Sequence, residues 1–383
     1  MSVILLCMGT RPEIIKLAPV YHALRELGHD VKVLHSGQHQ ELAWPLYRFF
    51  RMPPDLQFVP RREGQNLAVL NASLLEECAK AIESVKPDAV VVQGDTSTAL
   101  NAGWAAYLAN VPVAHVEAGL RTFERDPFPE EKNRELLGRL ATWHFPPTTQ
   151  SEHNLRQERV GGQVVLAGNT VVDAVQWAAD HLTQYTPEPD DQETWQWLDQ
   201  QAGRPVVLVT AHRRENWGQP MQQIVSAVEQ LIQAHPDVSW LWPVHQNPLV
   251  KADVMPLLDR LPPEAASRLR LTAGLGYPVL VKALRQCRIV LTDSGGIQEE
   301  AATLGLPVVI MRESTERQEL VDAGGGVLVG TDGGRILAHC GALLSDTSAR
   351  DAMKLSTNPF GDGLSSQRIA RTLDQALTPG QAD

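Results

Sequence analysis

Short runs of apolar and β-branched residues, bounded by Gly, Pro or Asp, recur along the chain and predict buried strands. In the first half these runs are Val3–Met8, Val31–His35, Ala89–Val92 and Val113–Val116. Helical spacing lies between them, as in Ile14, Leu17, Ala18, Tyr21 and Leu24, with Gly28 following as a C-cap. This alternation of strand and helix predicts a parallel sheet with right-handed crossovers.

The same alternation restarts in the second half after a polar, Pro-containing stretch, Thr183–Pro205, in which Trp195–Leu198 forms at most a short helix. Its strands are Ser239–Val244 and four others: Val206–Thr210, Ile289–Thr292, Val308–Met311 and Val327–Val329. We therefore predict an α/β fold of two Rossmann-like domains facing a cleft. The boundary is placed just before the polar stretch, at 171/172, so that the domains span 1–171 and 172–357.

Composition and charge narrow the function classes. The 383 residues suffice for two domains, and 43% apolar with 21% charged residues is typical of a globular protein. The net charge of −11 disfavours a protein that binds nucleic acid or an anionic membrane through a basic field. Four scattered cysteines, no signal peptide and no apolar run of membrane-spanning length favour a cytoplasmic protein with no membrane partner.

The first strand exit carries a candidate anion site. Gly9-Thr10-Arg11-Pro12-Glu13 has the spacing of a capping box, so a helix begins here. Its N-terminal amides, with Arg11 and Lys16, suit a phosphate, although an ordinary capped helix with two solvated cations has the same pattern. Neither GxGxxG nor a Walker A motif is present, which disfavours a dinucleotide or ATP.

Three acids follow the next strands. Asp95, Glu117 and Glu130 are expected at one edge of the sheet beside Arg121 and Arg134. Carboxylates in such a group can exchange protons while basic side chains hold a leaving anion. The alternative is structural: Asp95 caps a helix, and Glu117 pairs with Arg121.

The second half places His212 and His245 at strand exits, and His212 is followed by two arginines that suit a diphosphate. Asp293-Ser294-Gly295-Gly296 then predicts a strand, a turn and a helix start that can hold phosphate. Glu300 suits ribose hydroxyls, and Arg317 is a further phosphate or ribose contact. No histidine has metal-ligand spacing, so we predict no metal.

Taken together, these motifs resemble the non-hydrolysing UDP-N-acetylglucosamine 2-epimerases, and the resemblance spans nearly the whole chain. It rests on Gly9–Lys16, Gly37–His39, Gln93–Thr96, His115–Thr122, Pro129–Arg134, His212–Asn216, Pro243–Pro248, Asp293–Glu300, Thr315–Arg317 and Asn358–Gly363. The family has the two-domain GT-B fold. The resemblance further implies that a last helix within 358–383 returns to the N-terminal domain.

The resemblance also implies an activity. Family members interconvert UDP-N-acetylglucosamine (UDP-GlcNAc) and UDP-N-acetylmannosamine (UDP-ManNAc) by eliminating UDP to a bound 2-acetamidoglucal and adding it back, with no cofactor. The implied catalytic residues are Asp95, Glu117, Glu130 and His212. The implied substrate contacts are Arg11, Lys16, Asp95, Glu117, His212, Leu280 near uracil, Ser294, Gly295, Gly296, Glu300 and Arg317. Which carboxylate removes the C2 proton stays open.

Two further properties are implied by resemblance alone. The family is usually dimeric, and some bacterial members bind a second UDP-GlcNAc as an allosteric activator. The matching positions here are Gln38, His39, Gln65 and His245, whereas Glu41 and Gly64 depart from the activated pattern. The alternatives to a non-hydrolysing epimerase are a hydrolysing 2-epimerase, a GT-B glycosyltransferase that uses a UDP-sugar, and a sugar-nucleotide sensor.

Overall fold

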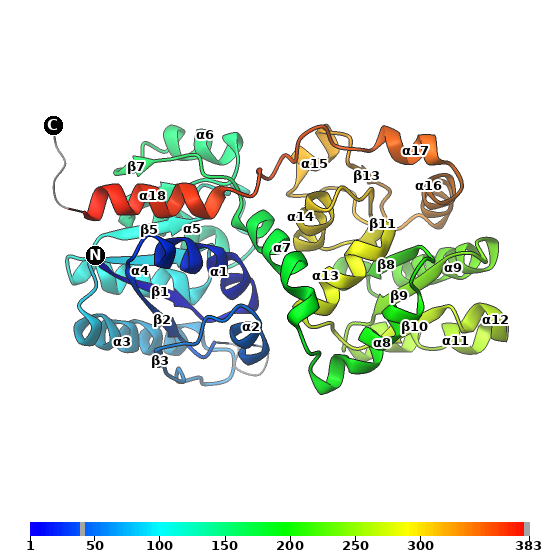
Figure 1. The fold of residues 1–383 in the computed structure, drawn as a ribbon, viewed down its shortest axis with the longest axis horizontal. Helices are drawn as coiled ribbons and strands as arrows, with labels where there is room; N and C mark the ends of the chain where they lie inside the picture. Colours follow the sequence, from blue (N-terminus) through cyan, green and yellow to red (C-terminus); the bar gives the residue numbers. More distant parts are fainter. Residues whose placement is uncertain (39–42, 379–383) are drawn as a thin grey trace. The chain divides into compact units, whose positions relative to one another are not determined.

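The computed structural model describes residues 1–38 and 43–378 and divides into two compact units. Unit 1 comprises Met1–Trp177 and Phe360–Asp383, and unit 2 comprises Ala178–Pro359. Each unit contains one parallel sheet with helices between successive strands, so the α/β class expected from the sequence is confirmed (Figure 1). No helix in the described residues is long and apolar enough to cross a membrane.

In the described part of unit 1, a seven-stranded sheet has the order β3-β2-β1-β4-β5-β6-β7. Its strands are β1 (Val3–Met8), β2 (Asp30–His35), β3 (Leu56–Gln57), β4 (Ala89–Gln93), β5 (Val113–Val116), β6 (Trp143–Phe145) and β7 (Gln163–Val164). Its helices are α1 (Arg11–Glu26), α2 (Trp44–Phe49), α3 (Leu67–Val85), α4 (Ser97–Leu108), α5 (Glu130–Leu140), α6 (Thr149–Gln157), α7 (Thr170–His181, which crosses the unit boundary) and α18 (Ser365–Leu377). The consecutive residues Ile4 and Leu5 of β1 and Val90 and Val91 of β4 are fully buried, as strands covered on both faces require.

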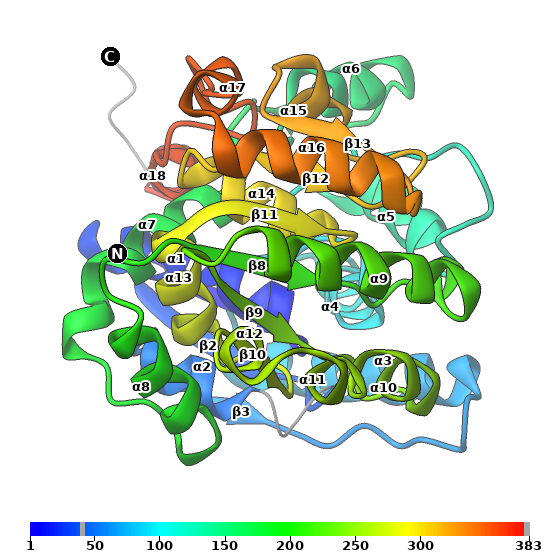
Figure 2. The ribbon, with the colours of Figure 1, turned by 90° about the vertical axis from the view of Figure 1, so that its right-hand side faces the viewer.

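Unit 2 repeats this topology in the order β10-β9-β8-β11-β12-β13. Its strands are β8 (Val206–Thr210), β9 (Ser239–Pro243), β10 (Leu269–Thr272), β11 (Cys287–Thr292), β12 (Val308–Ile310) and β13 (Gly326–Leu328). Its helices are α8 (Gln192–Gln200), α9 (Gln219–Ala234), α10 (Pro248–Val254), α11 (Leu257–Arg260), α12 (Pro263–Ala266), α13 (Tyr277–Gln286), α14 (Gly295–Thr303), α15 (Gln318–Asp322), α16 (Gly333–Ser345) and α17 (Thr347–Ala352). Helices α9 and α16 pack together against this sheet (Figure 2).

The sequence pattern located most of the strands, including the short, apolar β5, β12 and β13. Strands β3, β6, β7 and β10 were not predicted, because they have two to four residues and polar residues interrupt their apolar runs. The predicted strands ending at Val244, Met311 and Val329 each stop one residue earlier in the structure. Helix α1 is followed by Gly28 at φ 86°, so the predicted helix stop is confirmed.

Helix α18 belongs to unit 1, although it lies at the far end of the sequence (Figure 1). It packs against α1, and its first turn is fixed to α7 because Ser366 N and Oγ donate to Asp173 Oδ1 at 2.8 and 2.6 Å. Near its other end, Asp374 Oδ1 lies 3.2 Å from His29 Nε2. Helix α18 therefore completes unit 1 although it is distant in the sequence, since Ser366 follows Asp173 by 193 residues.

Buried histidines make the stability of this fold sensitive to acid. His115 on β5 is 1% exposed, and its Nε2 donates to Gly94 O at 2.7 Å. Burial lowers the pKa of His115 to about 3, and burial also lowers the pKa values of His144 and His35. These side chains are therefore neutral in the folded protein at neutral pH.

We expect the protein to lose stability as the pH falls from 7.5 to 5.0. Between pH 6.5 and about 3 the unfolded chain protonates His115 while the folded chain does not, so acid favours unfolding. Between pH 7.5 and 5.0, His115 alone contributes a loss of about 2 kcal/mol. Urea midpoints at the two pH values measure it. Because carboxylates also titrate, the decisive result is a smaller pH dependence in His115→Asn, and an equal dependence in both proteins would contradict the assignment.

Candidate active sites at the strand ends

Both sheets reverse their strand order at one point, between β1 and β4 in unit 1 and between β8 and β11 in unit 2. In doubly wound sheets, ligands bind outside the carboxyl ends of the strands at such points. The residues that follow β1 and β4 are Gly9–Lys16 and Gly94–Thr96, and those that follow β8 and β11 are Ala211–Asn216 and Asp293–Gly296. The predicted site residues therefore cluster at the switch point of each unit.

Glu13 organises the switch point of unit 1. Its buried carboxylate accepts from Gly9 N at 2.9 Å and from Thr10 N and Oγ1 at 2.8 and 2.7 Å, as the predicted capping box requires. Its other oxygen accepts from Thr96 Oγ1 at 2.6 Å and so ties α1 to the exit of β4. A Cβ on Gly9 would lie 1.9 Å from Ser36 Oγ, so only glycine fits this turn.

Glu117 lies at the end of β5 and pairs with Lys16, which the sequence predicted to contact a phosphate. Lys16 Nζ on α1 pairs with Glu117 Oε2, and Gln93 Nε2 donates to the same oxygen at 3.0 Å. Both charged side chains are 10% exposed. Lys16 and Gln93 therefore hold one carboxylate oxygen in place. The predicted alternative partner was wrong, because Arg121 pairs with Glu158 at 2.6 Å.

The backbone of Glu117 is strained. Its φ of 62° lies in the left-handed region, which side chains with a Cβ rarely adopt. The turn is held because Glu117 N and Ala118 N both donate to Phe145 O, at 3.1 and 3.3 Å. Strain of this kind persists where the surrounding structure fixes it, and it is concentrated at functional sites.

Asp95, at the end of β4, is held by α5. Arg134 Nε and Nη2 each lie 2.7 Å from Asp95 Oδ2, and Asn133 Nδ2 donates to the Asp95 carbonyl at 2.7 Å. The alternative role of Asp95 as a helix cap was wrong, because Thr96 is the N-cap of α4 and accepts from Ala99 N.

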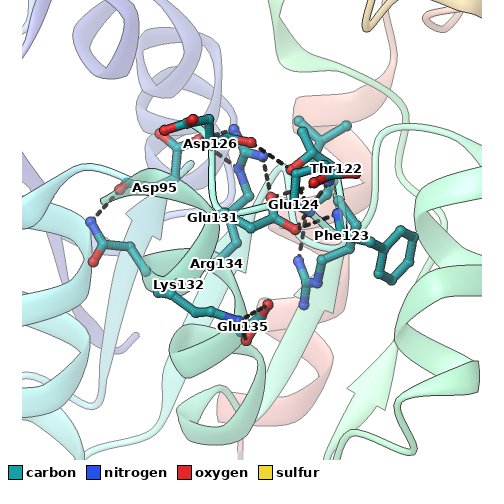
Figure 3. A network of polar contacts seen from close by, with 12 residues as sticks. Asp95, Thr122, Phe123, Glu124, Asp126, Glu131, Lys132, Arg134 and Glu135 are labelled. Atoms are coloured by element: carbon teal, nitrogen blue, oxygen red, sulfur yellow. Dashed lines mark hydrogen bonds and ion pairs between the residues drawn. The ribbon is translucent and has the colours of Figure 1, made fainter. Parts of the chain in front are cut away.

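Glu131 is a structural acid that the sequence analysis did not single out. Its side chain is 0% exposed and accepts from Thr122 N and Phe123 N at 3.0 Å and from Arg134 Nη1 at 2.9 Å. Figure 3 shows Arg134 bridging Glu131 and Asp95. The i,i+3 spacing of Glu131 and Arg134 was the available signal. Its neighbour Glu130, the predicted catalytic acid, is the half-buried first residue of α5.

The exits of β8 and β11 bring His212 and Asp293 together in unit 2. Asp293 Oδ1 lies 2.9 Å from His212 Nδ1, and its side chain is 0% exposed, whereas that of His212 is 42% exposed. The ring of His245 lies 6.4 Å from that of His212, so these two predicted residues are neighbours.

The predicted phosphate turn is also assembled in unit 2. Ser294 is the N-cap residue of α14, and Gly295 and Gly296 form its first turn. Arg317 lies against it: a Cβ on Gly295 would lie 3.4 Å from Arg317 Cζ. Glu299, which the sequence analysis did not assign, accepts from Arg317 Nε at 2.7 Å and fixes the guanidinium. Glu300 on α14 and Leu280 on α13 are both buried.

Three more of the predicted residues lie in the described part of unit 1. Arg11 is the half-buried first residue of α1. Of the positions matched to an activating ligand, Gln38 Oε1 accepts from Thr98 Oγ1 at 2.8 Å, and Gln65 is exposed in a turn before α3. His39 lies outside the described residues.

The chain is similar to known proteins over nearly its whole length. A family model described as UDP-N-acetylglucosamine 2-epimerase matches residues 22–374. The UDP-N-acetylglucosamine 2-epimerase of Salmonella typhimurium is 40% identical over 374 residues, which cover 97% of this chain and 98% of the relative. That of Yersinia pestis is 39% identical over 373 residues, again covering 97% and 98%.

The fold has solved counterparts. The structure of a UDP-GlcNAc 2-epimerase from Neisseria meningitidis bound to UDP-GlcNAc has a TM-score of 0.85 at 35% identity, covering 98% of this chain and 100% of the other. The expected GT-B class is confirmed by such neighbours. The chain, with two Rossmann-like units and acids at the strand ends, belongs to the UDP-N-acetylglucosamine 2-epimerases, a family of isomerases.

Proposed function

We propose that this protein interconverts UDP-GlcNAc and UDP-ManNAc by eliminating UDP to a bound 2-acetamidoglucal, after which UDP adds back at C1 while a proton returns to either face of C2. The observation that carries the proposal is the pair of carboxylates beside the β1/β4 switch point. Lys16 and Gln93 hold Glu117, and Arg134 holds Asp95. Family membership supplies the substrate class.

The chemistry explains why both acids and cations are needed. The C2–H bond breaks, its proton passes to a carboxylate, and its electrons form the C1=C2 bond as the C1–O bond to UDP breaks. C2–H has no adjacent ketone to acidify it, so loss of the stabilised diphosphate must run ahead of proton transfer. Return of a proton to the opposite face of C2 and re-addition of UDP at C1 complete the inversion.

We assign the proton transfers to Glu117, Asp95 and Glu130, with Glu117 or Asp95 as the C2 base and Glu130 assisting. Arg11, Lys16, His212, Arg317 and the turn at Ser294 stabilise the departing UDP. Cationic and N–H donors at helix starts are suited to diphosphate, because they give charge-assisted hydrogen bonds. Lys16 has a double role, since its ion pair with Glu117 couples the leaving-group site to the candidate base.

The test is the product formed from UDP-GlcNAc by the purified protein without NAD, added metal or sugar acceptor. We expect an equilibrium mixture of UDP-GlcNAc and UDP-ManNAc. Stoichiometric free UDP and N-acetylmannosamine would replace the proposal with a hydrolysing epimerase. An unchanged substrate would point to an acceptor-dependent transferase, a modified substrate or a sensor.

We also propose that two chains associate through an apolar face of unit 1, formed by Trp104, Tyr107, Leu108 and Leu136. Trp104 and Tyr107 stack at 5.6 Å between ring centroids, and all four side chains are exposed on the adjoining helices α4 and α5. Exposed apolar clusters are typical of protein interfaces, and the dimer expected from the resemblance would cover this one.

The oligomeric state measures this proposal directly. Light scattering should give the wild type twice the chain mass of 42.1 kDa, and Trp104→Glu should give 42.1 kDa because it adds a charge to the apolar face. Leu249→Glu, at an exposed leucine of α10, is the control and should stay dimeric. A monomeric wild type or a dimeric Trp104→Glu variant would contradict the proposal.

A further inference from the structure

Asp293 occupies the switch point of unit 2 without being assigned a role in the proposed reaction. It follows β11, and its N–H donates to Thr210 O at the end of β8, at 3.1 Å. Its side chain is completely buried. A buried carboxylate is costly unless donors surround it, so the contacts that this side chain makes indicate why it is there.

One oxygen of Asp293 fixes the chain that carries His212. Asp293 Oδ2 accepts from His212 N at 2.8 Å, from Arg213 N at 2.9 Å and from Asn216 Nδ2 at 2.9 Å. Trp217 Nε1 closes the same loop by donating to His212 O at 3.3 Å. The segment that presents His212 is therefore fastened to the end of β11.

The other oxygen, Oδ1, lies 2.9 Å from His212 Nδ1. Burial alone would raise the pKa of Asp293, but the hydrogen bond and charge of His212, with the N–H groups of Arg213 and His212, outweigh it and lower that pKa. An ionised carboxylate only accepts hydrogen bonds, so the imidazole nitrogen that faces it carries a proton. With the proton held on Nδ1, the ring does not exchange between its two neutral tautomers as an unpaired histidine does.

We infer that Asp293 is a positioning residue for His212, holding the imidazole with Nδ1 protonated so that Nε2 serves the ligand. In the proposed reaction, which identifies this ligand as UDP, His212 presents Nε2, the ring nitrogen that is not paired with Asp293, to the departing diphosphate. Unit 1 has a related arrangement, because buried Glu13 also joins the ends of its two central strands. Asp293 differs from Glu13 in contacting the side chain of a candidate catalytic residue.

A double-mutant cycle tests whether Asp293 acts through His212. Asp293→Asn keeps the size of the side chain and removes its charge, and we expect kcat to fall about 10²-fold, at the upper end of effects seen when a group that orients a functional histidine is lost. In a His212→Asn background the same change should alter kcat less than about threefold, because the residue that it orients is gone. Urea unfolding of all four proteins checks that each is folded.

An equal loss of kcat from Asp293→Asn in both backgrounds would overturn the inference, because Asp293 would then act on the fold alone. A second readout does not depend on turnover. In ¹⁵N-histidine NMR, the signal of His212 is the one that disappears in His212→Asn. In the wild type this signal should show Nδ1 protonated. In Asp293→Asn it should show a mixture of the two tautomers. Failure of UDP-GlcNAc turnover would refute the proposed function only, whereas a wild-type His212 protonated solely on Nε2 would refute the role of Asp293.

Discussion

Replacing Glu117 by Gln should reduce kcat for UDP-GlcNAc epimerisation by about 10³-fold, since positioned proton-transfer groups contribute roughly 10²- to 10⁴-fold. The amide keeps the size of the side chain but cannot accept the C2 proton. UDP binding should not weaken, because Lys16 loses the anion with which it pairs in the wild type. Initial rates and calorimetric titration with UDP measure the two effects separately.

The matched control for this variant is Glu152→Gln. Glu152 on α6 pairs with the exposed Arg156 four residues later, and exposed pairs of this kind contribute little to stability. Its kcat should equal that of the wild type. A Glu117→Gln enzyme with near-normal kcat would remove Glu117 from the proton-transfer step and leave Asp95 as the candidate base.

Replacing Glu130 and Glu131, the adjacent acids at the start of α5, should have different effects: loss of activity for Glu130 and loss of stability for Glu131. Glu131→Gln should lower the free energy of unfolding by about 3 kcal/mol, because it removes the charge from a buried ion pair with Arg134 and leaves backbone donors opposite an amide. Glu130→Gln should change stability by less than about 0.5 kcal/mol, as is usual away from such networks. Its kcat should fall about 10²-fold because it assists proton exchange.

Urea unfolding and initial rates on both variants check this contrast, and each variant is the control for the other. A stable Glu131→Gln protein would show that the network in Figure 3 does not hold the turn at Thr122 and Phe123. A fully active Glu130→Gln enzyme would remove Glu130 from the proposed mechanism.

Positions along the chain were easier to predict from the sequence than contacts across it. Strand exits could be recognised because apolar runs end at Gly9, Gly94 and His212, and parallel topology brings such exits to one edge. The capping box at Thr10 and Glu13 is local and was also predictable. Short edge strands such as β3 and β7 have two residues each and carry no periodic signal.

The partners of the site residues were not predictable, because they depend on how distant strands pair. Asp293 and His212 are 81 residues apart in the sequence, and Lys16 and Glu117 are 101 apart. Arg121 was matched with the nearby Glu117, whereas the fold supplies Glu158 instead. Sequence spacing therefore identified the candidate acids and bases, and the register of the sheets determines which cation each acid meets.

The most direct test of the proposed chemistry is proton NMR of UDP-GlcNAc with the purified protein in D₂O, following the anomeric and C2 protons over time. We expect deuterium to enter C2 of UDP-ManNAc as it forms, because the carboxylate that removes the C2 proton exchanges it with solvent before the other face is reprotonated. Formation of UDP-ManNAc that retains its original C2 proton throughout would contradict inversion by solvent-exchanging acids at this site.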